Sequence, residues 1–140
     1  MGNKYKLIPC EIKGFFRIKA LKDFANIHNG DIGGYVKSER NLSQSGDAWV
    51  YGNAKVYGNA KVCGEASVKS SRDYIVFKNW WSSGRYFTWT RSNNMWKVGC
   101  FYGTGQELIE KAYKDSELSG LEYERIVNYV NSILTDNAND

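Results

Sequence analysis

The side chains best suited to chemistry are tryptophans and arginines that gather in one stretch of the sequence. An aromatic ring stacks on a nucleobase with a free energy of about 1–3 kcal/mol, and an arginine fork donates hydrogen bonds to phosphate. Four of the five tryptophans lie in this stretch, together with two arginines: Trp80, Trp81, Arg85, Trp89, Arg91 and Trp96. The combination indicates a binding surface for an aromatic anion such as a nucleotide.

A glycine-rich helix start follows directly after this stretch. Gly103, Thr104 and Gly105 precede the helical pattern LIEKAY, and the free N–H groups of a helix N-terminus bind anions. The same residues also suit an ordinary helix cap, because Thr104 and Glu107 have the spacing of a capping box. The predicted ligand-binding set is Trp80, Trp81, Arg85, Arg91, Lys97, Gly103, Thr104 and Gly105.

Several of these aromatic and basic residues also have a structural interpretation. Trp89 shares a strand face with Phe87, so we expect it in the core rather than at a ligand. Trp80 and Trp81 are adjacent, so in a strand one of them must point away from the core. Arg85 stands at a predicted turn, where an arginine also serves as a surface residue.

The residue types needed for catalysis are sparse. His28 is the one histidine, so three imidazoles for a catalytic zinc ion are excluded. The sequence contains no phosphate-binding loop and no dinucleotide fingerprint. Helix starts or solvated helix faces hold the carboxylates Glu107, Glu110, Glu122 and Glu124. We therefore expect a protein that is not an enzyme and that uses no metal and no cofactor.

The cysteines and the charge distribution limit the cellular compartment and the kinds of partner that we expect. Cys10, Cys63 and Cys100 are odd in number and widely separated, which predicts reduced thiols in a cytosol, with Cys100 in a packed strand. No window is apolar enough for a membrane helix, and we expect no membrane partner. Residues 72–103 hold five basic side chains and one acidic, whereas residues 104–140 hold three basic and eight acidic. A basic sheet beside acidic helices permits an anionic partner without requiring nucleic acid.

The elements that position these residues follow from two kinds of periodicity. Between residues 46 and 68 the template Gly-x-Ala-x-Val-x runs four times, as GDAWVY, GNAKVY, GNAKVC and GEASVK. This period of six predicts a short β-solenoid with alanine and valine inside, preceded by a hairpin over residues 4–24. Tyr51 and Tyr57 would then form an exposed ladder.

The second half of the chain shows strand and helix patterns. Residues 73–102 predict three antiparallel strands, and two helices follow, with capping boxes at Thr104 and at Ser119-x-x-Glu122. The apolar stripes place both helices on one side of the sheet. The predicted fold is mainly β with α, with a hairpin and β-solenoid over residues 1–69 and a three-stranded sheet with two helices over residues 70–140.

The stretch RIKALKDFANIHNGDIGGYVKSERNLSQSGDAWVYGNAKVYGNAKV resembles bacteriophage and prophage accessory proteins with degenerate left-handed β-helix repeats. The resemblance covers residues 4–68. A sheet-and-helix module ends many of those proteins, and the stretch before its first helix is similar to Gly99, Cys100, Phe101, Gly103 and Thr104 here. The repeats differ from those of hexapeptide acyltransferases, because glycine stands two positions after valine and the repeats lack histidine.

The resemblance and the binding set together imply a phage protein that opposes bacterial defence in the host bacterial cytoplasm. We expect it to sequester a small nucleotide-derived immune signal, such as a cyclic ADP-ribose isomer or a cyclic oligonucleotide, as a homo-oligomeric sponge. Two alternatives stay open. One is an interaction protein similar to anti-CRISPR inhibitors that docks on a host complex or on nucleic acid, and the other is a structural oligomerisation module.

Overall fold

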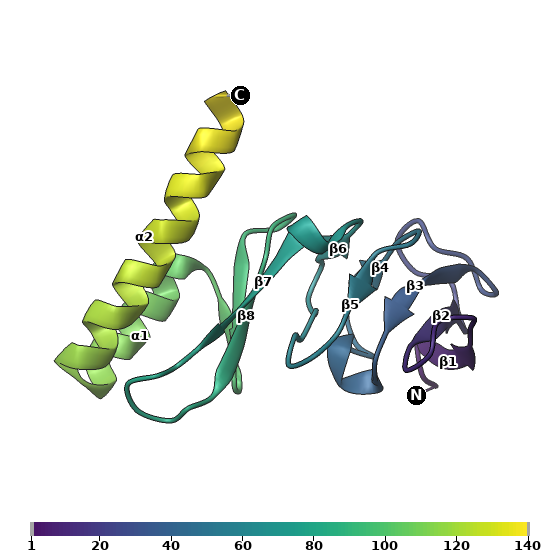
Figure 1. Ribbon diagram of the computed structural model, residues 1–140, viewed down its shortest axis with the longest axis horizontal. Helices are drawn as coiled ribbons and strands as arrows, with labels where there is room; N and C mark the ends of the chain where they lie inside the picture. The colour runs from purple at the N-terminus through teal and green to yellow at the C-terminus, as the bar shows by residue number, and fades with distance from the viewer. Residues whose placement is uncertain (1, 140) are drawn as a thin grey trace.

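Three β-sheets and two α-helices follow one another along the molecule (Figure 1). The computed structural model describes residues 2–139, with side chains up to residue 135. The first sheet begins with an antiparallel hairpin of β1 (Tyr5–Pro9) and β2 (Phe16–Ala20), which confirms the predicted hairpin. It continues with β3 (Ile32–Val36), antiparallel to β2, and β5 (Lys55–Val56), parallel to β3.

The Gly-x-Ala-x-Val-x repeats form only two-residue strands. β4 (Trp49–Val50) and β6 (Ser67–Val68) pair in parallel as a separate two-stranded sheet. The template glycines all have positive φ, between +58° and +74°, so each one turns the chain after a few residues. All four template alanines and all four valines are buried, which confirms the inward positions predicted from the repeat.

The predicted β-solenoid is nevertheless wrong. Strands of this half are spread over two different sheets, because β5 joins the sheet of the N-terminal hairpin while β4 pairs with β6. The hairpin and β3 form longer hydrogen-bonded ladders than the two-residue strands of the repeats. The repeat strands are therefore divided between the two sheets. A hexapeptide period fixes which side chains point inward, but it does not fix which backbone edge each strand joins.

The third sheet is antiparallel and has four strands, in the order β10-β9-β8-β7. Its strands are β7 (Tyr74–Lys78), β8 (Tyr86–Thr90), β9 (Met95–Val98) and β10 (Phe101–Gly103). The prediction of three strands is wrong because Gly99, at φ +56°, reverses the chain between β9 and β10. Cys100 lies in this turn and is exposed, so its predicted place in a packed strand is also wrong.

Two helices complete the chain, α1 (Gly105–Asp115) and α2 (Glu117–Asn139). Thr104 and Glu107 form the predicted capping box at the start of α1. The second predicted cap is wrong, because α2 begins two residues before Ser119. There the Ser116 hydroxyl accepts a hydrogen bond from the Ser119 N–H at 3.1 Å. Neither helix of the described residues is long and apolar enough to cross a membrane.

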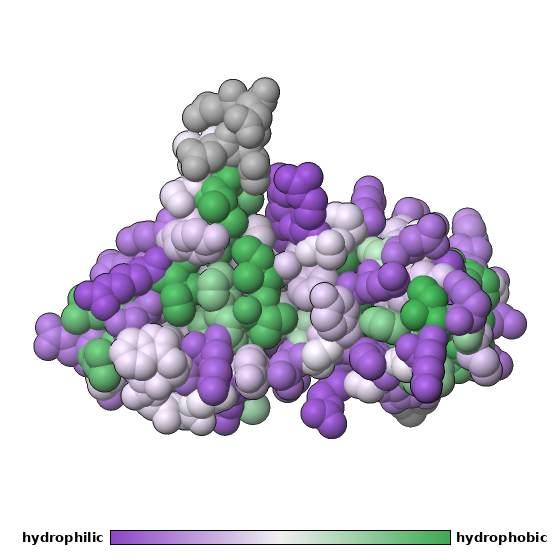
Figure 2. Space-filling model, in the orientation of Figure 1, coloured by the Kyte–Doolittle hydropathy of each residue, from purple (hydrophilic) through white to green (hydrophobic). Residues whose placement is uncertain are grey.

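The third sheet lies between the helices and the repeats (Figure 1), and hydrophobic residues gather on the surface where α2 meets β7 (Figure 2). Phe87 and Trp89 are buried on the helix side with Val130, which confirms that Trp89 is a core residue. Thr88 faces the other way and accepts a hydrogen bond from the Lys61 N–H at 2.9 Å. Two short 3₁₀ helices, η1 (Glu39–Asn41) and η2 (Ser71–Asp73), lie within the first half and at the start of the second. The helices therefore cover one face of the third sheet and the repeats contact the other.

Candidate functional site

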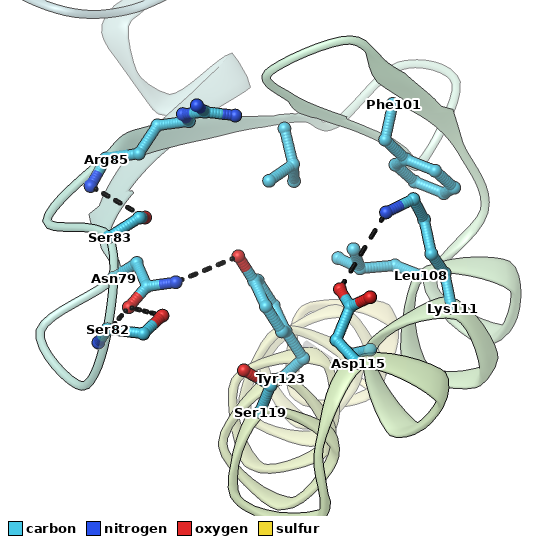
Figure 3. A pocket seen from close by; sticks show the side chains of 12 residues that line it. Asn79, Ser82, Ser83, Arg85, Phe101, Leu108, Lys111, Asp115, Ser119 and Tyr123 are labelled. Carbon is cyan, nitrogen blue, oxygen red and sulfur yellow. Dashed lines mark hydrogen bonds and ion pairs between the residues drawn. The ribbon is translucent and has the colours of Figure 1, made fainter.

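A pocket of about 210 Å³ opens where the β7–β8 turn meets the end of α1 and the start of α2 (Figure 3). Two cations line it, Arg85 at the start of β8 and Lys111 on α1. The same pocket contains the rings of Phe101 and Tyr123. We call it the Arg85 pocket. It combines positive charge, hydroxyl and amide donors, and aromatic surface in one concave place, which is typical of a small-ligand site.

Asn79 fixes the polar wall of the Arg85 pocket. Its side-chain oxygen accepts hydrogen bonds from the N–H of Ser82 at 2.9 Å and from the hydroxyl of Ser82 at 3.1 Å. Its amide nitrogen donates to the Tyr123 hydroxyl, at a longer 3.5 Å (Figure 3). The Ser83 hydroxyl in turn accepts the Arg85 N–H at 3.1 Å. These bonds hold the turn in one shape, so its hydroxyls are placed before a ligand arrives.

Among the described residues Arg85 has no ion pair, whereas Lys111 is paired with Asp115, which also lines the pocket. The Arg85 guanidinium lies over Gly99, where any side chain would collide with it. Lys111 has an ion pair to Asp115 at 3.9 Å, and both side chains are more than half exposed. Exposed pairs at this helical spacing contribute only about 0.3–0.5 kcal/mol, so an anionic ligand competes easily for the ammonium.

Aromatic rings form the inner side of the Arg85 pocket. Tyr123 is buried, and its burial raises the pKa of the phenol, so the hydroxyl stays a neutral hydrogen-bond donor. The ring of Trp81 meets Tyr123 edge-on at 4.9 Å between centroids. The Trp81 indole N–H donates to the Ser119 hydroxyl at 3.0 Å. Trp81 therefore supports the pocket wall from behind.

The other tryptophan of the pair points outward. Trp80 is 69% exposed and lies perpendicular to Trp81, with 6.0 Å between the ring centroids. One of the two adjacent rings is exposed as expected, but strand alternation is not the reason, because β7 ends at Lys78 and both tryptophans lie in the following turn. Trp80 is the exposed ring nearest in the chain to the polar wall, and it is available for stacking.

The structure separates the three predicted cations. Arg85 lines the pocket described above, whereas Arg91 lines a shallow groove beside Trp89 and the far half of α2. Lys97 lines a third cavity on the opposite face of the sheet. The three predicted cations therefore line three separate cavities, and Arg85 is the one that lines the Arg85 pocket.

The predicted glycine-threonine-glycine segment makes contacts within the chain. The Thr104 N–H donates to the Glu107 carboxylate at 2.9 Å, and the Thr104 hydroxyl accepts the Glu107 N–H at 3.2 Å. A Cβ at Gly103 would lie 2.8 Å from the same carboxylate. A Cβ at Gly105 would lie 2.6 Å from Val127 of α2. Both glycines thus leave room for the cap and for the close packing of the helices.

Three pocket residues have no signal in the sequence that marks them for this role. The sequence places Asn79 near the end of the first predicted strand of the sheet, and it marks neither Lys111 nor Tyr123 for a site. Their convergence depends on the approach of α1 and α2 to the β7–β8 turn.

Comparisons with known proteins add no family to this geometry. No protein-family model and no curated protein sequence matches the chain. Within residues 2–139, no three histidine, cysteine, aspartate or glutamate side chains gather as metal ligands would.

Proposed function

We propose that this protein binds a small nucleotide-derived anion without transforming it, and that the Arg85 pocket holds the charged part of that ligand. The observation that carries the proposal is the convergence of Arg85 and Lys111 on one cavity that also contains two aromatic rings. An arginine fork suits phosphate, and the hydroxyls of the turn add neutral donors. The same cavity offers no histidine as a general base.

The size of the pocket limits which part of a ligand it holds. Sites that enclose a whole drug-sized molecule measure about 300–1,000 Å³, and this pocket measures about 210 Å³. It therefore accommodates a phosphate with an adjoining sugar, while a base remains outside. Trp80 is exposed beside the pocket's supporting ring, Trp81, and would give that base a stacking surface.

The biological setting is part of the same proposal. The resemblance of residues 4–68 to phage and prophage accessory proteins supports a phage protein that acts in the host bacterial cytoplasm. A sponge for a cyclic ADP-ribose isomer or a cyclic oligonucleotide needs tight binding and no turnover. We propose a homo-oligomer as well, and the side chain of Tyr57, which is 50% exposed, is a candidate contact.

A thermal-shift panel tests this proposal on the whole chain. Cyclic ADP-ribose isomers and cyclic oligonucleotides are each mixed with the protein, and the freed ligand is analysed after heating. We expect one of them to raise Tm and to return unchanged. Lys111→Gln and Arg85→Gln should abolish the shift, while Lys114→Gln, on the same helix outside the pocket, should retain it.

The alternatives give different results in the same experiment. A changed ligand after heating would make the protein an enzyme. The absence of any shift would refute the nucleotide proposal and favour docking on a host complex. Binding to nucleic acid would weaken steeply with salt, in proportion to the number of phosphates contacted.

A further inference from the structure

A second basic cavity lies on the opposite face of the third sheet, where the repeats meet β9 and β10. It measures about 300 Å³ and shares no lining residue with the Arg85 pocket. β9 separates the two, because Lys97 points into the second cavity while its neighbour Val98 lines the first. We call the second cavity the Lys97 pocket.

Three cations from three separate segments surround the Lys97 pocket. Arg40 comes from η1, Lys61 from the repeats and Lys97 from β9. Asp47 and Glu65 each stand next in the chain to a lining glycine, but neither carboxylate lines the cavity. The two ion pairs found among the described residues, Lys111–Asp115 and Arg125–Glu122, do not involve these three cations. The three cations around this hollow are therefore held in no close ion pair, although the charge of Glu65 acts on the lining residue Tyr102.

Two serine hydroxyls and the ring of Tyr102 complete the lining of the Lys97 pocket. The hydroxyls of Ser43 and Ser45 both line it and lie 3.0 Å apart. Tyr102 closes one side, where it fits against Gly64 because a side chain at that glycine would occupy the position of the phenol oxygen. That oxygen accepts a hydrogen bond from the Asn93 amide at 3.0 Å, which holds the ring in place.

We infer that the Lys97 pocket is a second binding site and that it takes a phosphorylated small molecule. Three cations and two hydroxyls around one hollow match the charge and the several acceptor oxygens of a phosphoryl group. A cavity of about 300 Å³ reaches the size of small-ligand pockets. Nucleic acid would instead need cations spaced along successive phosphates, and here they surround one concave place. This inference does not depend on the Arg85 pocket.

Calorimetry with inorganic pyrophosphate tests the Lys97 pocket directly. We expect the intact protein to bind pyrophosphate in 150 mM salt, and Lys61→Gln and Lys97→Gln each to weaken the affinity at least tenfold. Lys13→Gln removes an equal charge from the exposed turn of the N-terminal hairpin and should leave the affinity unchanged. Circular dichroism before each titration confirms that the variants are folded.

A thiol measurement gives an independent readout in the folded wild-type chain. Cys63 lines the Lys97 pocket, while Cys100 lies in the exposed turn between β9 and β10. Bound pyrophosphate should slow the alkylation of Cys63 at least threefold and leave Cys100 unaffected.

The absence of pyrophosphate binding would overturn the inference, and so would unchanged alkylation of Cys63. An equal loss of pyrophosphate affinity in Lys13→Gln would also overturn it, as would a loss of that affinity in Arg85→Gln but not in the Lys61 and Lys97 variants. A single-stranded oligonucleotide that binds more tightly than a nucleoside triphosphate, with a steep salt dependence, would likewise overturn a small-molecule site in favour of nucleic acid.

Discussion

Lys4 is a buried cation whose titration should be visible in the stability of the whole protein. Its side chain is fully buried, and its ammonium donates hydrogen bonds to the carbonyl oxygens of Ala48 at 2.7 Å and Gly46 at 3.3 Å. The ammonium also lies 5.2 Å from the centre of the Phe24 ring. Burial lowers the pKa of Lys4 from 10.5 to about 8, and the nearby Asp47 offsets only part of that effect.

The sign of the pH dependence follows from these two values. Between pH 8 and 10.5 the unfolded chain keeps the Lys4 proton while the folded chain has lost it, so stability rises with pH. From pH 7 to pH 9 Lys4 alone contributes a gain of about 1.3 kcal/mol, and Cys63 offsets part of it because burial raises the pKa of its thiol. Above pH 10 burial of Tyr5 acts in the opposite direction, because it raises the pKa of the phenol and the unfolded chain ionises first.

Urea unfolding at constant ionic strength, at pH 7 and at pH 9, measures this gain. A gain of this size moves the urea midpoint upward by about 0.4–1.3 M. Lys4→Met should remove the rise, and the exposed Lys6→Met should keep it. The reasoning is refuted if stability is flat from pH 7 to 9 in the wild-type chain, or if the rise persists in Lys4→Met.

Three further predictions concern packing, capping and thiol reactivity. Gly33→Ala should lower the free energy of unfolding by at least about 2 kcal/mol in urea titrations, because its Cβ would lie 2.7 Å from the Val50 carbonyl oxygen; a loss below 0.5 kcal/mol would contradict this packing. Thr104→Ala should cost about 1 kcal/mol in the same assay through loss of the α1 cap, and it should leave pyrophosphate affinity unchanged; weaker binding would instead place a phosphate at that helix start. Cys100 should react with a small alkylating reagent at least tenfold faster than Cys63, because burial raises the pKa of the Cys63 thiol. Peptide mass spectrometry measures both rates, and equal rates would contradict the prediction.

The repeats show how far a local pattern reaches. The period of six predicts the inward side chains, and every template alanine and valine is buried as expected. It does not predict the strand partners, because a two-residue strand carries too few hydrogen bonds to fix its own neighbour. The ladders of the hairpin and of β3 decide that β5 joins one sheet while β4 and β6 form another.

The candidate site shows the same division. Composition alone indicates that a basic, tryptophan-rich segment precedes an acidic helical one, and Arg85 in the pocket agrees with that indication. Periodicity alone predicts Trp89 as a core residue and both helices on one side of the sheet. Each of these features depends on residues close together in the chain.

The partners of each cation depend on contacts between distant segments. Lys111 shares a cavity with Arg85 only because α1 lies against the end of the third sheet. Lys97 shares a cavity with Arg40 and Lys61 only because η1 and the repeats lie against the other face of that sheet. Local periodicity and charge can be followed along the sequence, and they indicate which residue types are available and which faces they occupy. Which cations share a cavity depends on the tertiary structure, because a pocket is made where separate elements pack together.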